Sequence, residues 1–70
     1  MLTNSRDIIR RLEREGWTLV RVTGSHHVFK KPTSGETLVV PHPKKDLGKG
    51  LVRPIYLVRA IYKAAGWKPD

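Results

Sequence analysis

Two adjacent histidines in a short, turn-like stretch are the residues of this chain best suited to chemistry. They stand in Gly24-Ser25-His26-His27, and imidazole exchanges protons near neutral pH, as acid–base catalysis requires. Runs rich in β-branched and aromatic residues lie on both sides, over 17–22 and 26–31. The stretch between them therefore predicts the connection of a β-hairpin, with Gly24 supplying the positive φ that so short a connection needs.

Strand alternation separates the two histidines. Successive side chains of a strand point to opposite faces of the sheet, so His27 shares a face with Phe29 and His26 takes the other face. Because Phe29 is the clearest core residue of this strand, we expect His26 on the open face.

The same alternation applies to the preceding strand. If Val20 and Val22 are core residues, Arg21 joins His26 on the open face. A histidine beside an arginine on an open sheet face is a candidate site. The alternative is an ordinary surface histidine next to a plain turn.

The net charge indicates the class of partner. Fourteen Lys and Arg against six Asp and Glu give a formal charge of +8 in 70 residues. Such an excess favours polyanions, so nucleic acid, or an acidic protein that mimics it, is the leading partner. No predicted helix has the large apolar face and dense basic face of an interfacial helix, so we expect no membrane binding. The alternative is that the basic residues only keep a small domain soluble.

Length and composition predict one domain over 1–70 that is monomeric when free. The chain has no cysteine, which excludes disulfides and Cys-based metal sites and suits a reducing cytoplasm. No signal peptide is recognisable, and no stretch approaches the about 20 apolar residues of a membrane span. We therefore expect a cytoplasmic protein.

The order of elements predicted along the chain is helix, three strands, helix. Asn4 or Ser5 can cap a first helix that ends at Gly16. Strands follow over 17–22, 26–31 and 37–40, with Pro41 stopping the third. Short connections favour an antiparallel meander with both helices on one face, an α+β sandwich of α-β-β-β-α order. Double-stranded-RNA-binding domains have this architecture.

Helical spacing of apolar residues predicts the last helix. Pro54 is tolerable only in a first turn, so the helix should begin near Val52, and Gly66 should end it with Trp67 packing back over its end. Its apolar face consists of Leu51, Ile55, Val58, Ile61, Tyr62 and Ala65.

A basic loop leads directly into this helix. Lys44, Lys45 and Lys49 stand beside a helix N-terminus, whose free N–H groups favour phosphate. Before them, His42 is held in an extended segment by the proline that follows it. His42 is a candidate second acid or base, or equally an exposed loop histidine.

Four stretches together resemble a known family: Gly16-Trp17, the run from Arg21 to Phe29, the run from Val40 to Leu47, and Ala65-Gly66. From about Ser5 to Trp67 the chain resembles the HicA toxins of bacterial type II toxin–antitoxin systems. The resemblance implies a double-stranded-RNA-binding-like fold, mRNA interferase activity and inhibition by a HicB antitoxin. The family's catalytic histidine directly follows Gly-Ser, which falls on His26. Pro54 and Ala64, the latter where many members have glutamine, depart from the pattern away from this site.

RNA cleavage without a metal needs a base for the 2′-hydroxyl, an acid for the leaving oxygen and nearby positive charge. His26 is the candidate proton carrier, with Arg21, Ser25 and the three loop lysines as RNA-binding residues. We expect neither metal nor cofactor, because His26 and His27 diverge and the acidic residues are scattered. The alternative function is a non-catalytic RNA-binding module of the same fold, which would need no histidine on the open face.

Overall fold

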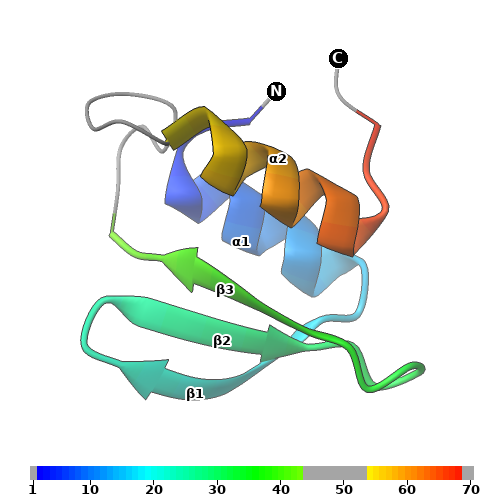
Figure 1. The fold of residues 1–70 in the computed structure, drawn as a ribbon. Helices are drawn as coiled ribbons and strands as arrows, with labels where there is room; N and C mark the ends of the chain where they lie inside the picture. Colours follow the sequence, from blue (N-terminus) through cyan, green and yellow to red (C-terminus); the bar gives the residue numbers. More distant parts are fainter. Residues whose placement is uncertain (1, 44–53, 69–70) are drawn as a thin grey trace.

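Two helices cover one face of a three-stranded antiparallel sheet in the computed structural model, which describes residues 2–43 and 54–68 (Figure 1). The strand order is β1-β2-β3, and the predicted α-β-β-β-α order is confirmed. The elements are α1 (Ser5–Arg14), β1 (Thr18–Thr23), β2 (His26–Lys30), β3 (Thr37–Pro41) and α2 (Pro54–Ala65).

The helix ends follow the predicted signals. Asn4 caps α1 by accepting a hydrogen bond from the backbone N–H of Arg6 at 2.9 Å, and Gly16 follows the helix with a φ of 94°. The described part of α2 begins at Pro54. The predicted start near Val52 and the predicted core residue Leu51 lie outside the described residues, and the side chain of Ile55 also lies outside the description.

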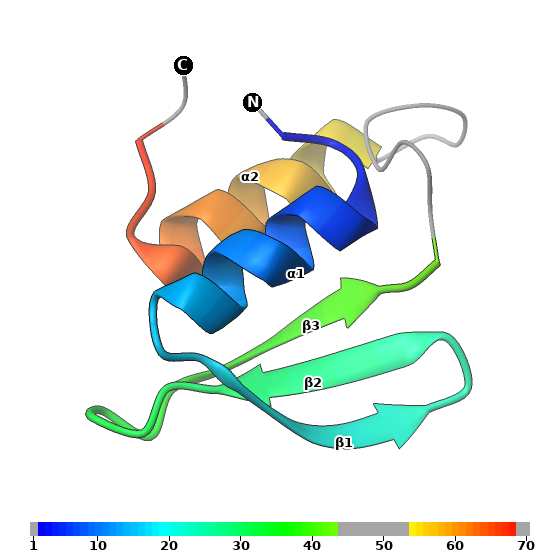
Figure 2. The same ribbon diagram turned by 180° about the vertical axis from the view of Figure 1, so that it is seen from behind.

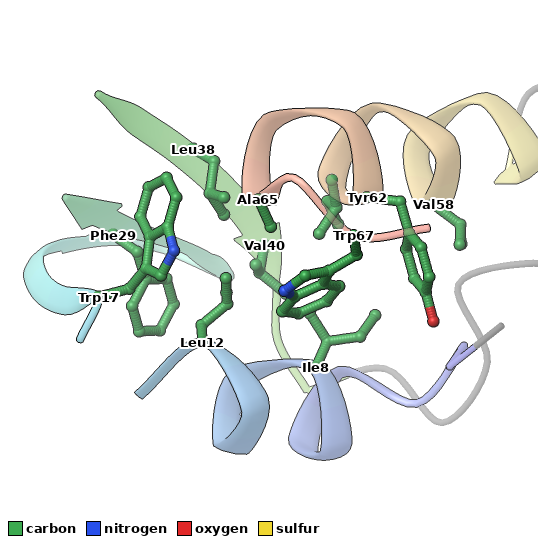
Figure 3. Packing of buried hydrophobic residues seen from close by; sticks show 11 residues of the cluster. Ile8, Leu12, Trp17, Phe29, Leu38, Val40, Val58, Tyr62, Ala65 and Trp67 are labelled. Carbon is green, nitrogen blue, oxygen red and sulfur yellow. The ribbon is translucent and has the colours of Figure 1, made fainter. Parts of the chain in front are cut away.

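The core lies between the helices and the sheet. Figure 3 shows the indole of Trp67 between the two helices, and its ring meets that of Tyr62 edge to face at 5.2 Å. The indole Nε1 donates to Glu15 Oε1, at the end of α1, at 2.7 Å. The backbone N–H of Trp67 donates to the carbonyl oxygen of Tyr62 at 2.8 Å, so Trp67 packs back over the end of α2 as predicted. The buried cluster comprises Ile8, Leu12, Trp17, Phe29, Leu38, Val40, Val58, Ile61, Tyr62, Ala65 and Trp67.

The assumption that Val20 and Val22 are core residues, from which Arg21 was placed on the open face, is wrong. Their side chains are 53% and 51% exposed. The physical reason is the position of β1: both helices contact β3, and in both views β1 is the strand farthest from the helices (Figures 1 and 2). A register shift between Leu19 and Arg21 also breaks the simple alternation of β1.

Candidate functional site

The turn between β1 and β2 has the tight geometry that its sequence predicts. It is a two-residue loop, Gly24-Ser25. Gly24 has a φ of 58°, and no non-glycine residue in the described ranges has a positive φ. A positive φ at the first loop position alone is the pattern of a type II′ hairpin turn, whose twist matches that of the flanking strands. The turn therefore places His26 at the first position of β2.

His26 lies exposed on the open face of the sheet. It is paired with Thr23 on β1 and with Pro41 on β3. Arg21 is paired with Val28, which shares the face of His26 because the two residues are two positions apart. Arg21 is exposed as well. The predicted placement of His26 and Arg21 on one open face is therefore confirmed, even though the assumption about Val20 and Val22 behind it is not.

His27 points to the helix side of the sheet, as alternation predicts. Its cross-strand neighbours are Val22 and Val40, and Val40 is fully buried. His27 is half-buried. Its Nδ1 is buried and has no hydrogen-bond partner among residues 2–43 and 54–68. An unpaired buried nitrogen costs stability, so Nδ1 does not help to hold this ring in place.

His42 connects three parts of the chain at this end of the sheet. Its Nδ1 lies 2.7 Å from the hydroxyl oxygen of Ser5, the first residue of α1. Its ring meets the ring of His27 edge to face, with centroids 5.0 Å apart. Its backbone N–H donates to the carbonyl oxygen of Ser25 at 2.7 Å. His42 thus ties the hairpin turn to the start of α1.

These contacts decide where the candidate second acid or base lies. β3 does bring His42 to the end of the sheet that carries His26, as its proposed role requires. The His42 ring, however, packs against His27 on the helix side, whereas His26 faces the open side. The two candidate proton carriers therefore flank the end of the sheet from opposite faces.

Sequence patterns did not indicate Ser5 as part of this site. Ser5 is 1% exposed, and it contacts a histidine 37 positions away. Its candidate role as a helix cap was the only local signal, and Asn4 fills that role. Only the packing of α1 against the end of β3 brings the hydroxyl to His42.

The predicted phosphate-binding residues Lys44, Lys45 and Lys49 lie outside the described residues. Ser25, the remaining predicted RNA-binding residue, is exposed in the turn. Within the described ranges, no three His, Asp or Glu side chains are grouped as metal ligands. No described helix is both long and apolar enough to cross a membrane.

Comparison with known protein families matches residues 5–67 to the HicA toxin of bacterial toxin–antitoxin systems. The chain belongs to the HicA toxin family. The match spans both helices, the whole sheet and the histidine turn. A search of curated proteins found no match. As a HicA toxin, the chain has an antitoxin as its partner, and the end of the sheet described above is its candidate functional site.

Removing the Ser5 hydroxyl should loosen this end of the HicA chain. Ser5→Ala deletes the partner of His42 Nδ1, so we expect a loss of about 1–2 kcal/mol in the free energy of unfolding. Denaturant unfolding and the imidazole NMR signals of His42 measure the effect. Ser34→Ala is the matched control, because it removes an exposed serine that bonds Glu36. Unchanged stability together with unchanged His42 signals would contradict the contact.

Proposed function

We propose that this HicA chain is a metal-independent endoribonuclease that cleaves mRNA in the cytoplasm and is neutralised by a HicB-type antitoxin. The position of His26 is the main support for this proposal. It is an exposed titratable side chain at the head of β2, on a sheet face that no described helix covers, with Arg21 on the same face. Membership in a toxin family and the net charge of +8 support RNA as the target.

The chemistry requires only groups that this chain has. His26 takes the proton of a 2′-hydroxyl, and the 2′ oxygen attacks the adjacent phosphorus. The bond from phosphorus to the 5′ oxygen breaks, and that oxygen takes up a proton. The products are a 2′,3′-cyclic phosphate and a free 5′-hydroxyl. The Arg21 guanidinium can stabilise the charge that develops on the phosphoryl oxygens.

His42 is the proposed acid for the leaving oxygen. Ser5 occupies its Nδ1, which leaves Nε2 as the nitrogen that can exchange a proton with substrate. Since His26 and His42 lie on opposite faces, the RNA strand must pass over the end of the sheet beside Ser25. Lys44, Lys45 and Lys49 are proposed to hold the phosphates on either side of the cut.

The antitoxin is proposed to act by covering this end of the molecule. A basic toxin of charge +8 calls for an acidic surface large enough to cover His26 and the lysine loop together. Complementary charge speeds association more than it sets the final affinity, so the complex should form quickly and in a salt-sensitive way. Inhibition then follows from blocked access to His26.

A pair of matched oligonucleotides separates the nuclease from a non-catalytic RNA-binding module. We expect the chain to cut a single-stranded RNA and to leave the deoxy strand of the same sequence intact, because DNA lacks the attacking hydroxyl. Gel analysis of both strands, with filter binding in parallel, provides the measurement. RNA that is bound but never cut by folded protein would favour the binding module, and cleavage of the deoxy strand would rule out attack by the 2′ oxygen.

Salt dependence should report the phosphate contacts of the loop. Binding to a single strand should weaken with a log–log slope of roughly −0.7 for each phosphate neutralised. Changing Lys44 and Lys45 together to glutamine should make that slope shallower by about one to two units. The matched control is the same double change at Arg10 and Arg14, two exposed residues of α1. If the slope changes only in the Arg10 and Arg14 variant, the phosphate contacts lie on the first helix.

A further inference from the structure

β1 carries an apolar surface that the described part of the chain leaves uncovered. Leu19, Val20 and Val22 are 42%, 53% and 51% exposed. The only other large hydrophobic residue exposed to this degree in the described ranges is Val39, on β3. Three exposed aliphatic side chains on one strand of a small, highly charged protein indicate a binding surface.

One edge of the β1 backbone is also without a partner strand in the described part of the chain. The strand order β1-β2-β3 leaves one edge of β1 without a neighbouring strand among the described elements, and Figure 1 shows it as the outermost strand. A free edge presents N–H and C=O groups to which another chain can add a strand. The apolar side chains and the open edge therefore lie on the same element.

Charge disfavours pairing of β1 with a second copy. Arg21 is exposed on the strand, and each copy carries a charge of +8. Like charges repel across such an interface, whereas an acidic strand would be attracted.

We propose that the edge of β1 is the docking site for an extended acidic segment of the antitoxin, which adds a strand to the sheet. Leu19 and Val22 are paired with Phe29 and His27 and so face the helix side, where apolar residues of the segment cover them. On the open side, carboxylates of the segment face Arg21. The segment therefore alternates apolar and acidic residues. This inference rests on the proposed function for the identity of the partner.

Such a strand would also explain how docking leads to inhibition. β1 leads directly into the turn of Gly24 and Ser25, which His26 follows at the start of β2. A segment paired along β1 places the rest of the antitoxin beside that turn. Leu19 and Val22, the apolar residues of the docking surface, have no part in the proposed chemistry, so changing them can alter binding without altering catalysis.

Hydrogen exchange and one pair of variants test the proposal on the complex with the protein encoded by the neighbouring gene. We expect the backbone amides of 18–23 to exchange more slowly in the complex. The double variant Leu19→Thr, Val22→Thr places a β-branched residue, which suits a strand, at both positions but removes apolar area, and should weaken binding by about tenfold or more. Val39→Thr is the matched control, with similar exposure on the opposite face, and should bind within about twofold of the wild type.

Each other outcome overturns the proposal. Unprotected β1 amides in the complex would rule out strand addition even if the variants failed to fold. Equal weakening by Val39→Thr would place the interface on the open face, and self-association of the free chain through β1 would make a second copy the occupant. If no complex forms, the neighbouring protein is not the partner that docks on β1. RNA cleavage by the free wild-type chain and by the double variant reports separately on the proposed nuclease function.

Discussion

His26→Ala is expected to abolish RNA cleavage while the protein stays folded. Loss of a general base typically lowers the rate by about 10²–10⁴-fold. The side chain is exposed at the edge of a turn, so its removal should leave the melting temperature nearly unchanged. Single-turnover cleavage rates and thermal melts of the same preparations give both quantities.

Thr23→Ala is the matched control for this substitution. Thr23 is exposed, lies directly opposite His26 on β1 and shares its face, but it cannot act as a base near neutral pH. The control should retain most of the wild-type rate. Undiminished cleavage by folded His26→Ala protein would remove His26 from the mechanism, and equal loss in both variants would point to damage of the hairpin rather than to lost chemistry.

His27→Ala is expected to cost stability more than chemistry. The substitution empties a half-buried position between Val22 and Val40 and deletes the ring contact with His42. We expect a loss of about 1–3 kcal/mol in the free energy of unfolding. For a domain of this size each kcal/mol lowers the melting temperature by roughly 4–8 °C. Cleavage measured well below the melting temperature should remain.

His27→Leu sharpens this prediction. Leucine refills much of the space and removes the buried Nδ1 that has no partner among the described residues. Replacing an unpaired polar group by an apolar one of similar size is close to neutral or stabilising. We therefore expect His27→Leu to melt near the wild type. Full stability with lost cleavage in either His27 variant would assign the chemistry to His27 instead of His26.

Local patterns predicted the features of the site that depend on neighbouring residues. Gly24 and Ser25 predicted the turn, and the alternation of β2 separated His26 from His27, because both follow from backbone geometry over a few residues. Phe29 marked the buried face correctly for the same reason. These predictions needed no knowledge of how the elements pack.

The features that depend on packing could not be predicted in this way. Val20 and Val22 have the composition of core residues, but alternation does not reveal that β1 extends beyond the helices. No glycine, the usual sequence signal of a bulge, stands at the bulge after Leu19. The contact between Ser5 and His42 joins residues 37 positions apart and depends on where α1 crosses the end of β3.

RNA cleavage by the purified chain in excess EDTA is the most direct test of the central claim. A single-stranded RNA is incubated with the protein after removal of divalent ions, and the fragments are resolved over time beside a sample to which Mg²⁺ is restored. A metal-independent histidine mechanism predicts the same fragments at similar rates in both samples, each ending in a 2′,3′-cyclic phosphate. Intact RNA in EDTA, with cleavage appearing only when Mg²⁺ is restored, would contradict it.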